Sequence, residues 1–448
     1  MQKKIKNILA KPIYVYLLGV FFIVYRTMQF PKAFDILIFS AVLVGYLIVV
    51  FLLLFLFKKV KHIHYWVFCL MLFSLFAQEI ATLFFSIIKL IRLDRFRYVI
   101  ILYPLTCLLL FIIKIKFFKG IKFEIGLNIF LIIVIVTNII NGFIVERKEW
   151  QHLSINQSKN IQLVKSEKPD DIIWILLDEY ASTSYLSNQL HFHNSFPEVL
   201  KNKGFYTVDS MPSRFDLTLF SINSIFNLDD SILHSTFGYA RNALINNIYY
   251  NELKKQNYNF INYEFLGFPI KSEVESNFNP VFPKNYKEQI FFNSLISIIQ
   301  MKLFNYQINS YNTQIVPAAL KKINTQQNQK RFFWVHALMP HPPFFKDSLG
   351  NNIERVYNDN ISNKKNIDSL YCNYLAYANK VVLKFLDSIK DWQHKTIIIS
   401  GDHGYRVGLK TNNPYRFATF AAIYYPKMDT VDLKKIKYLQ QIPLHLKY

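Results

Sequence analysis

Residues 395–404, KTIIISGDHG, decide the fold, because a short apolar run is followed at once by Gly-Asp-His-Gly. A run of this length that ends in turn residues is typical of a buried strand. Residues 172–177, IIWILL, repeat the arrangement earlier in the chain and end in Asp178-Glu179. Residues 259–264 and 331–338 (RFFWVHAL) are two further candidate strands.

Helical patterns separate these candidate strands. Residues 195–203 precede Gly204, a natural helix C-cap, and residues 370–389 are strongly amphipathic. Strands that alternate with helices predict an α/β domain with a central, mostly parallel sheet, to which we assign residues 171–448. Ligands bind such sheets at the carboxyl ends of the strands.

Asp178, Asp402 and His403 each come directly after one of the apolar runs. Two carboxylates and an imidazole at neighbouring strand ends can converge on one divalent cation, which makes these residues candidate metal ligands. Alone, each is an ordinary loop residue, and it is the combination that predicts a site. The ligand types do not choose among Mn, Zn, Mg and Ca.

Thr218 lies in residues 215–227, FDLTLFSINSIFN, whose apolar residues recur at helical spacing. We expect Asp216 to cap this helix and Thr218 to lie in its first turn, where exposed N–H groups favour a bound phosphate or sulfate. A metal bound beside Thr218, with its hydroxyl as a further ligand, would lower the hydroxyl pKa and make it a nucleophile. The alternative is that Thr218 only caps the helix.

His336 and His341 lie five residues apart, and a Pro-Pro pair follows the second. They can bind a substrate phosphate, protonate a leaving oxygen or ligate a second metal. For His336, which falls within a candidate strand, the alternative is a core histidine with satisfied hydrogen bonds.

The first 150 residues are of a different character. Hydrophobic residues make up 52% of the chain and charged residues only 18%, and the longest apolar runs lie before residue 146. We predict a transmembrane bundle of about five helices in residues 1–145, followed by a linker at residues 146–170. The apolar stretches are residues 13–24, 34–57, 65–88, 98–113 and 125–145. A span needs about 20 apolar residues, so the first and fourth depend on their polar flanks.

Lysines beside alternate apolar stretches indicate how this bundle is oriented in the membrane. They precede the first stretch, separate the second from the third, and separate the fourth from the fifth. With the N-terminus in the cytoplasm, this pattern satisfies the positive-inside rule and leaves residues 171–448 outside the inner membrane. Arg92, Arg95 and Arg97 disagree with it, and we interpret their loop as an interfacial segment. Glu79, within the third stretch, is either functional or paired with a Lys or Arg near a helix end.

The net charge of +22 divides unevenly along the chain. Residues 1–150 contain 19 Lys or Arg and 6 Asp or Glu, a charge of +13, and the 33 basic and 24 acidic residues after them leave +9. The excess therefore consists mostly of topology signals beside spans, which argues against a nucleic-acid partner and suits an anionic lipid or phosphate substrate. Cys372 is the only cysteine after residue 150, so no disulfide forms within that part.

Taken together, ILLDEY at 175–180, the helix with Thr218, the His336 and His341 segment and SGDHG at 400–404 resemble a membrane-anchored, sulfatase-like protein. Such proteins belong to the alkaline-phosphatase superfamily, alongside lipoteichoic acid synthases and phosphoethanolamine transferases. The resemblance, over roughly residues 170–427, implies metal ligands at Asp178, Asp402 and His403. Thr218 matches the threonine that becomes covalently modified in the transferases.

The same resemblance implies further roles. His341 is similar to a substrate-binding histidine, and Glu179 stands where true sulfatases often have a second aspartate ligand. Ser210 to Arg214, SMPSR, resembles the sulfatase signature in which Cys or Ser becomes formylglycine, but it precedes the helix that should carry the nucleophile. We interpret it as a chance match, with Arg214 assisting anion binding.

The function that this resemblance implies is transfer of a phospho group from a membrane phospholipid to an envelope glycan or polymer, through a phospho-threonine intermediate. The alternatives are a sulfatase, a phosphodiester hydrolase or a catalytically inactive membrane relative.

Overall fold

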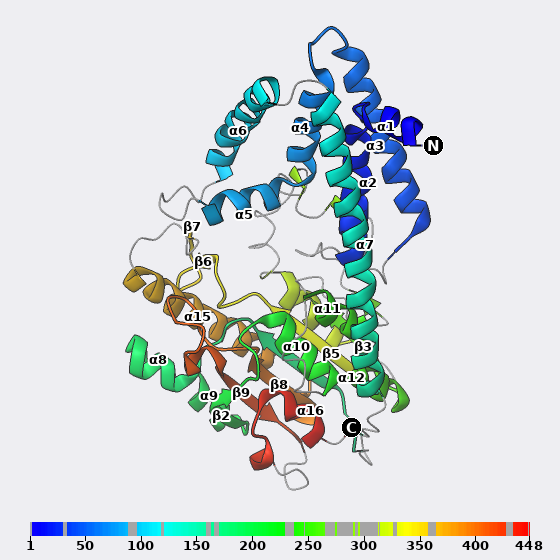
Figure 1. The fold of residues 1–448 in the computed structure, drawn as a ribbon. Coiled ribbons are helices and arrows are strands. Elements are labelled where there is room, and N and C mark those ends of the chain that lie inside the picture. Colours follow the sequence, from blue (N-terminus) through cyan, green and yellow to red (C-terminus); the bar gives the residue numbers. More distant parts are fainter. Residues whose placement is uncertain are drawn as a thin grey trace. The chain divides into compact units, whose positions relative to one another are not determined.

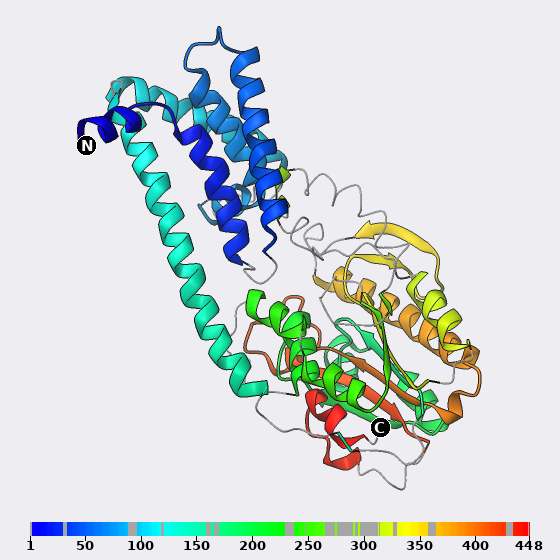
Figure 2. The same cartoon turned by 90° about the vertical axis from the view of Figure 1, so that its right-hand side faces the viewer.

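The computed structural model describes residues 2–29, 34–87, 96–117, 121–157, 163–164, 170–228, 237–245, 247–264, 274–275, 290–291, 294–295, 312, 314–325, 329–356, 364–426, 433–446 and 448. The chain divides into two compact units (Figures 1 and 2). The first comprises Met1–Gln151 and Pro283–Asn305, and the second comprises His152–Phe282 and Tyr306–Tyr448.

The described part of the first unit is almost entirely helical, and each of the five apolar stretches falls in helices. The helices are α1 (Gln2–Leu9), α2 (Tyr14–Gln29), α3 (Ile36–Leu56), α4 (Ile63–Leu75), α5 (Ala77–Ile87), α6 (Phe96–Phe117) and α7 (Ile121–Gln157). α7 continues past the last apolar stretch into the expected linker, of which residues 158–162 and 165–169 lie outside the described residues. So do Arg92 and Arg95 of the expected interfacial loop.

Two helices among the described residues are long and apolar enough to cross a membrane, Ile36–Leu56 and Phe123–Ile144. α4 and the first part of α5 reach that length only together, which gives a third span if the pair is counted as one. α2 is apolar but shorter. By length and composition, two or three of the five expected spans are therefore clear. Many large apolar side chains of α3 are exposed, as the lipid-facing surface of a span would be.

The third apolar stretch differs from the continuous span that we expected. It breaks at Phe76, where α4 ends, and α5 turns away by 88°. The residues just after the break include Gln78 and Glu79, whose polar side chains do not suit the middle of a span.

An ion pair joins this bend to the last turn of α2. Arg26 Nη1 lies 2.7 Å from Glu79 Oε1, and the arginine side chain is 1% exposed. The guanidinium also lies over the rings of Phe22, Tyr25 and Phe76, between 5.3 and 5.9 Å from their centroids. Of the two interpretations of Glu79, the structure therefore agrees with pairing to an arginine near a helix end.

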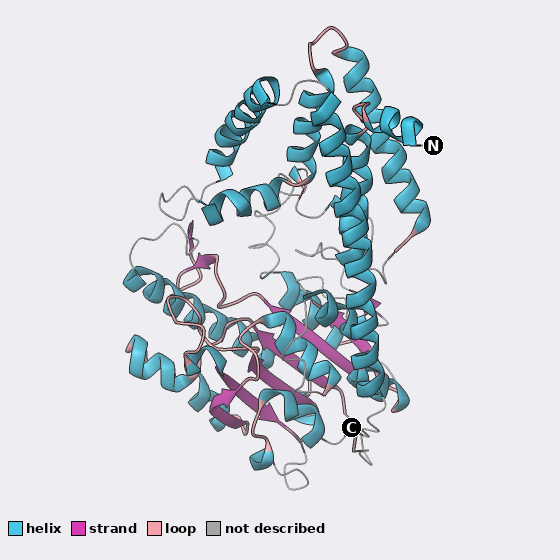
Figure 3. Ribbon diagram, viewed as in Figure 1, coloured by secondary structure: helices cyan, strands magenta, loops and turns pink. Residues whose placement is uncertain are grey.

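In the second unit a seven-stranded sheet has the order β2-β9-β8-β1-β5-β3-β4 (Figure 3). The strands are β1 (Ile172–Leu177), β2 (Tyr206–Pro212), β3 (Asn259–Tyr263), β4 (Val274–Glu275), β5 (Arg331–Ala337), β8 (Thr396–Gly401) and β9 (Ala418–Tyr424). β8, β1, β5, β3 and β4 are parallel, whereas β9 runs antiparallel to both β8 and β2. The predicted α/β domain with a mostly parallel central sheet is thus confirmed, and the antiparallel edge of β9 and β2 is an addition to it.

Helices cover both faces of this sheet. One face packs on α8 (Thr183–Leu190), α9 (Phe196–Asn202) and α15 (Lys364–Ser388), and the other on α10 (Thr218–Asn227), α11 (Phe237–Ile245), α12 (Ile248–Lys255) and α16 (Ile442–His445). The second unit also contains a helix at residues 314–323 and a small hairpin of β6 (Phe344–Lys346) and β7 (Asn352–Val356). Its short 3-10 helices are η4 (Trp392–His394), η5 (Pro414–Phe417), η7 (Leu433–Lys435) and η8 (Leu439–Gln441).

β1 is buried on both of its sides, which explains why its sequence is apolar throughout instead of alternating. Ile173, Ile175 and Leu177 belong to one core, and Trp174 to the opposite core. There the Trp174 ring lies edge-on to that of Trp334 on β5, 5.4 Å between centroids.

We predict that the Arg26–Glu79 pair stabilises the bend as a unit. Glu79→Gln leaves Arg26 buried without its counter-charge and should lower the free energy of unfolding by about 3–5 kcal/mol. The double variant Arg26→Met/Glu79→Gln removes both charges and should regain most of that loss. Thermal unfolding of the full chain in detergent measures both. A double variant that is less stable than Glu79→Gln would contradict the prediction.

Candidate functional site

The carboxyl ends of β8, β1 and β5 meet at one edge of the sheet. Leu177 is paired with Ala337 of β5 and with Gly401 of β8, so all three strands end at the same level. Asp178 follows β1, and Asp402 with His403 follows β8. The register of the sheet therefore brings together residues that are more than 200 positions apart in sequence.

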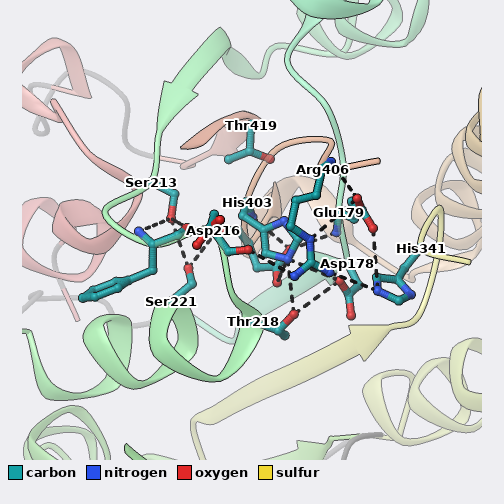
Figure 4. A network of polar contacts seen from close by, with 12 residues as sticks. Asp178, Glu179, Ser213, Asp216, Thr218, Ser221, His341, His403, Arg406 and Thr419 are labelled. Carbon is teal, nitrogen blue, oxygen red and sulfur yellow. Dashed lines mark hydrogen bonds and ion pairs between the residues drawn. The ribbon is translucent and has the colours of Figure 1, made fainter. Parts of the chain in front are cut away.

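Asp178, Asp402 and His403 form a group whose potential ligand atoms all lie within 4.8 Å of one another. All three side chains are buried. Asp402 Oδ1 accepts hydrogen bonds of 2.9 Å from the backbone N–H groups of Glu179 and His403. Asp402 Oδ2 lies 3.2 Å from His403 Nε2 and has no hydrogen-bond partner among the described residues. Figure 4 shows Asp178 and His403 facing each other in this group.

The electrostatics of the two aspartates differ. Burial raises the pKa of Asp402 above its usual range, and the neighbouring Asp178 adds to that effect, whereas His403 opposes it. For Asp178, burial alone would raise the pKa, but the imidazoles of His341, His336 and His403 hold it below its usual range. A divalent cation between the two carboxylates would favour the charged form of Asp402. The ligand types and the unpartnered oxygen of Asp402 therefore fit such a cation.

The two glycines around Asp402 and His403 are required by close packing. A Cβ on Gly401 would lie 2.0 Å from Thr419 Oγ1, and a Cβ on Gly404 would lie 2.0 Å from the carbonyl oxygen of Tyr415. A side chain at either position would push the turn away from the sheet. The Gly-Asp-His-Gly sequence is thus the form in which this turn fits against β9 and η5.

Thr218 is the first residue of α10 and lies beside the group of three (Figure 4). Its Oγ1 is 3.4 Å from Asp178 Oδ1 and 3.4 Å from His403 Nε2. The hydroxyl is therefore close enough to share a cation with these two residues. The sequence predicted this helix and this position for Thr218.

The expected cap of α10 is wrong in detail. The N-cap residue is Leu217, which cannot cap with its side chain, and Asp216 instead forms an ion pair with Arg416, 2.6 Å between Oδ2 and Nη2. The preference of aspartate for the N-cap gave way here to an ion pair with a half-buried arginine of η5. The first N–H groups of α10 consequently keep their capacity to bind an anion.

His341, Glu179 and Arg406 form a second cluster beside Asp178 (Figure 4). Arg406 Nη2 lies 3.2 Å from His341 Nε2, and the Arg406 backbone N–H donates to Glu179 Oε1 at 2.8 Å. Glu179 Oε2 lies 3.6 Å from His341 Nε2. Glu179, expected as an additional metal ligand, is therefore engaged by a histidine and an arginine and is not one of the three grouped ligands.

Arg406 was not singled out from the sequence. Its guanidinium donates to the backbone carbonyl of Asp216 at 3.2 Å, so it connects the turn after β8 to the start of α10. Burial would lower the pKa of Arg406, but the nearby carboxylates, Glu179 first among them, raise it above its usual value. A permanent positive charge thus lies beside the three candidate metal ligands. Its signal in the sequence was its place two residues after Gly-Asp-His-Gly.

His336 is fully buried within β5, and its two ring nitrogens face two carboxylates. Nδ1 lies 2.8 Å from Glu264 Oε1, and Nε2 lies 3.8 Å from Asp178 Oδ2. Burial alone would lower the pKa of His336, but Glu264 and Asp178 raise it to about 10. Each interpretation from the sequence is therefore partly right: His336 is a buried core residue, and it also adjoins the site.

Ser210 and Arg214 lie in and just after strand β2. Ser210 is exposed, so the residue that would carry formylglycine is on the surface of this edge strand. Arg214 lies over the ring of Tyr438, 3.5 Å from the guanidinium carbon to the centroid, and its backbone N–H donates to Gln440 Oε1.

Known structures resemble this chain at low sequence identity. The phosphoethanolamine transferase EptA from Neisseria meningitidis aligns over 79% of this chain and 67% of its own, with 12% identity and a TM-score of 0.40. The lipoteichoic acid synthase LtaP from Listeria monocytogenes aligns over 62% and 72%, with 13% identity and a TM-score of 0.38. The periplasmic domain of EptC from Escherichia coli, a complex with Zn, aligns over 63% and 81%, with 10% identity and a TM-score of 0.37. No curated protein sequence matches the chain.

The family model described as Sulfatase matches residues 175–438, more than half of the chain. The match begins within β1 and includes Thr218, His341, Asp402 and His403. It confirms the resemblance that the motifs indicated. The chain therefore belongs to the sulfatase family.

Proposed function

We propose that this protein is a membrane-bound, metal-dependent phospho-group transferase. In this proposal residues 1–145 anchor the protein, and residues 171–448 act outside the cytoplasm, with Thr218 as nucleophile. The donor is a membrane phospholipid, and the acceptor is a hydroxyl group of an envelope glycan or polymer.

The position of the Thr218 hydroxyl is the observation that carries this proposal. It lies 3.4 Å from Asp178 Oδ1 and from His403 Nε2, two members of the group that could hold a metal ion. It also begins α10, where backbone N–H groups favour an anionic substrate. A threonine that only capped a helix would not need two metal-ligand side chains beside it.

Asp178, Asp402 and His403 would hold the cation, with Thr218 as a further ligand. The cation would supply charge stabilisation to the phosphoryl oxygens and lower the pKa of the bound hydroxyl. Glu179 contributes indirectly, because its carboxylate fixes the backbone of Arg406.

In the first step the Thr218 oxygen bonds to the phosphorus atom, and the bond from phosphorus to the lipid alcohol breaks. The threonine gives up one proton, and the departing lipid oxygen takes one up, so the step releases and consumes no net proton. In the second step an acceptor hydroxyl bonds to the phosphorus atom, the bond to Thr218 breaks, and the threonine oxygen is protonated again. A phosphodiester of Thr218 lies between the two steps.

Arg406 and His341 are the side chains that we expect to bind the anionic oxygens of the substrate. They lie 3.2 Å apart beside Asp178, where they place positive charge and hydrogen-bond donors next to the reacting group. Arg214, proposed from the sequence as a further anion contact, lies over Tyr438 and is a weaker candidate.

A lipid donor is favoured because the same chain has helices apolar enough to cross a membrane. An enzyme anchored beside its substrate meets it at high local concentration. Hydrolysis would use the same first step with water in place of the acceptor, so only the second step separates the two reactions.

The first test is cation binding by the purified full chain in detergent. We expect wild type to bind Mn²⁺, Zn²⁺ or Mg²⁺, and Asp402→Asn and His403→Gln to bind at least about 100-fold more weakly, since loss of an outer partner alone costs 10–100-fold. Asp387→Asn, which changes an exposed carboxylate, is the control. Titration calorimetry measures the affinities, and a wild type that binds none of these ions would remove the basis of the proposal.

The second test is a covalent adduct on Thr218. After incubation with candidate phospholipids, mass spectrometry should find a phospho group on the peptide that contains Thr218, and Thr218→Ala should lose it together with more than about 10³-fold of the turnover. Ser210→Ala should behave as wild type. Formylglycine at Ser210, with no adduct on Thr218, would instead establish the sulfatase alternative.

The third test concerns Arg406. Arg406→Gln should slow formation of the adduct by about 10²-fold, because it removes a charged donor from the developing negative charge. Lys410→Gln, which removes an exposed cation in the same segment, is the matched control. Equal rates in Arg406→Gln and wild type would exclude this role.

A further inference from the structure

Glu264 is a buried carboxylate that follows β3 and uses both of its oxygens on one neighbouring strand. Oε1 contacts His336 Nδ1 at 2.8 Å, and Oε2 accepts a hydrogen bond of 3.0 Å from Trp334 Nε1. The register of β3 and β5 pairs Tyr263 with Val335, which brings Glu264, the residue just after β3, alongside His336. Glu264 is therefore fixed by the sheet and by two side-chain contacts.

The contact with Glu264 orients the His336 ring. The Glu264 carboxylate favours a proton on Nδ1, and the contact holds the ring with Nε2 on the opposite side. Nε2 has no hydrogen-bond partner among the described residues, and its closest charged neighbour is Asp178 Oδ2 at 3.8 Å. The side chain of His336 is 0% exposed, so this unused nitrogen is aimed within the protein and not at solvent.

The two oxygens of Asp178 consequently face different groups. Oδ1 lies 3.4 Å from Thr218 Oγ1 and 3.8 Å from His403 Nε2, on the side of the candidate cation. Oδ2 faces His336. A carboxylate in this setting is prepared to bind a cation with one oxygen while the other accepts a hydrogen bond.

We propose that Glu264 and His336 form a positioning arm that holds Asp178 as a one-oxygen ligand of a divalent cation. Glu264 fixes His336, and His336 Nε2 fixes Oδ2, which leaves Oδ1 to the cation beside Thr218. Outer partners of this kind raise metal affinity because the ligand does not have to be ordered when the ion binds. The inference rests on the cation site of the proposed function and adds to it two residues that do not touch the ion.

The test is Mn²⁺ binding to the full chain in detergent, measured by titration calorimetry and by the electron paramagnetic resonance spectrum of the bound ion. Glu264→Gln should weaken binding about 10–100-fold and change the spectrum. Glu252→Gln is the control, because it makes the same change at a buried carboxylate on α12 that is paired with Lys255 and lies outside the arm. It should keep the wild-type affinity and spectrum.

The outcomes separate the inference from the proposed function. A wild type that binds none of Mn²⁺, Zn²⁺ and Mg²⁺ refutes the cation site itself, and if Zn²⁺ or Mg²⁺ binds but Mn²⁺ does not, the affinities of wild type and Glu264→Gln are compared with that ion. If Glu264→Gln binds Mn²⁺ as tightly as wild type does, only the positioning arm is refuted.

A structure of the Mn²⁺-loaded wild type, with the ion located by anomalous scattering, tests the arm without any substitution, in case Glu264→Gln does not fold. One Asp178 oxygen on the ion, with His336 Nε2 on the other oxygen, is the expected result. Binding through both oxygens, or directly through His336, overturns the proposal.

Discussion

The parallel pairing of β1 with a strand on each side is the constraint on which the rest of the site depends. β5 and β8 end level with β1, and β3 ends nearly level beyond β5. Asp178, Asp402 and His403 therefore all leave the sheet at the same edge. Shifting one strand by a single residue would turn its side chains to the opposite face and separate Asp178 from Asp402.

Such an arrangement buries several charges close together, and that burial has to be compensated. Isolated ionised groups in a protein interior are strongly unfavourable, and buried charges persist only when they are paired or bound to metal. Here His336 lies between two carboxylates, and Arg406 lies beside Glu179. Asp402 has one oxygen without a hydrogen-bond partner among the described residues, and that is where the compensation is incomplete.

Much of the fold could be predicted from the sequence, because its central strands are continuous apolar runs that end in polar residues. The strands at residues 172–177, 331–338 and 395–400 and the helix that starts at Thr218 could be recognised in this way. β9 (ATFAAIY) and β2 (YTVDSMP) were missed, since neither is a continuous apolar run that ends in a polar motif. The break at Phe76 was not predicted, and the ion pair just after it joins Glu79 to an arginine about fifty residues earlier in the chain.

The residues of the candidate site could likewise be predicted only in part. Asp178, Asp402, His403 and Thr218 were found because each follows a strand or opens a helix, and the structure brings them together. Glu264 also follows a strand, yet it was passed over because its importance comes from His336 on the neighbouring strand. The capping prediction for Asp216 failed for a related reason, since Arg416 competes for the same carboxylate across the fold.

The two tryptophans in the core have a consequence of their own. Trp334 donates its indole N–H to Glu264, and Trp174 donates to Ser400, two residues before Asp402. Each indole is thus hydrogen-bonded to a residue next to the polar edge of the sheet, and the two rings adjoin each other. Indole emission depends on the charge and hydrogen bonding around the ring. These two of the chain's five tryptophans are therefore built-in optical reporters of that edge, and their signal is isolated when the other three are replaced by Phe.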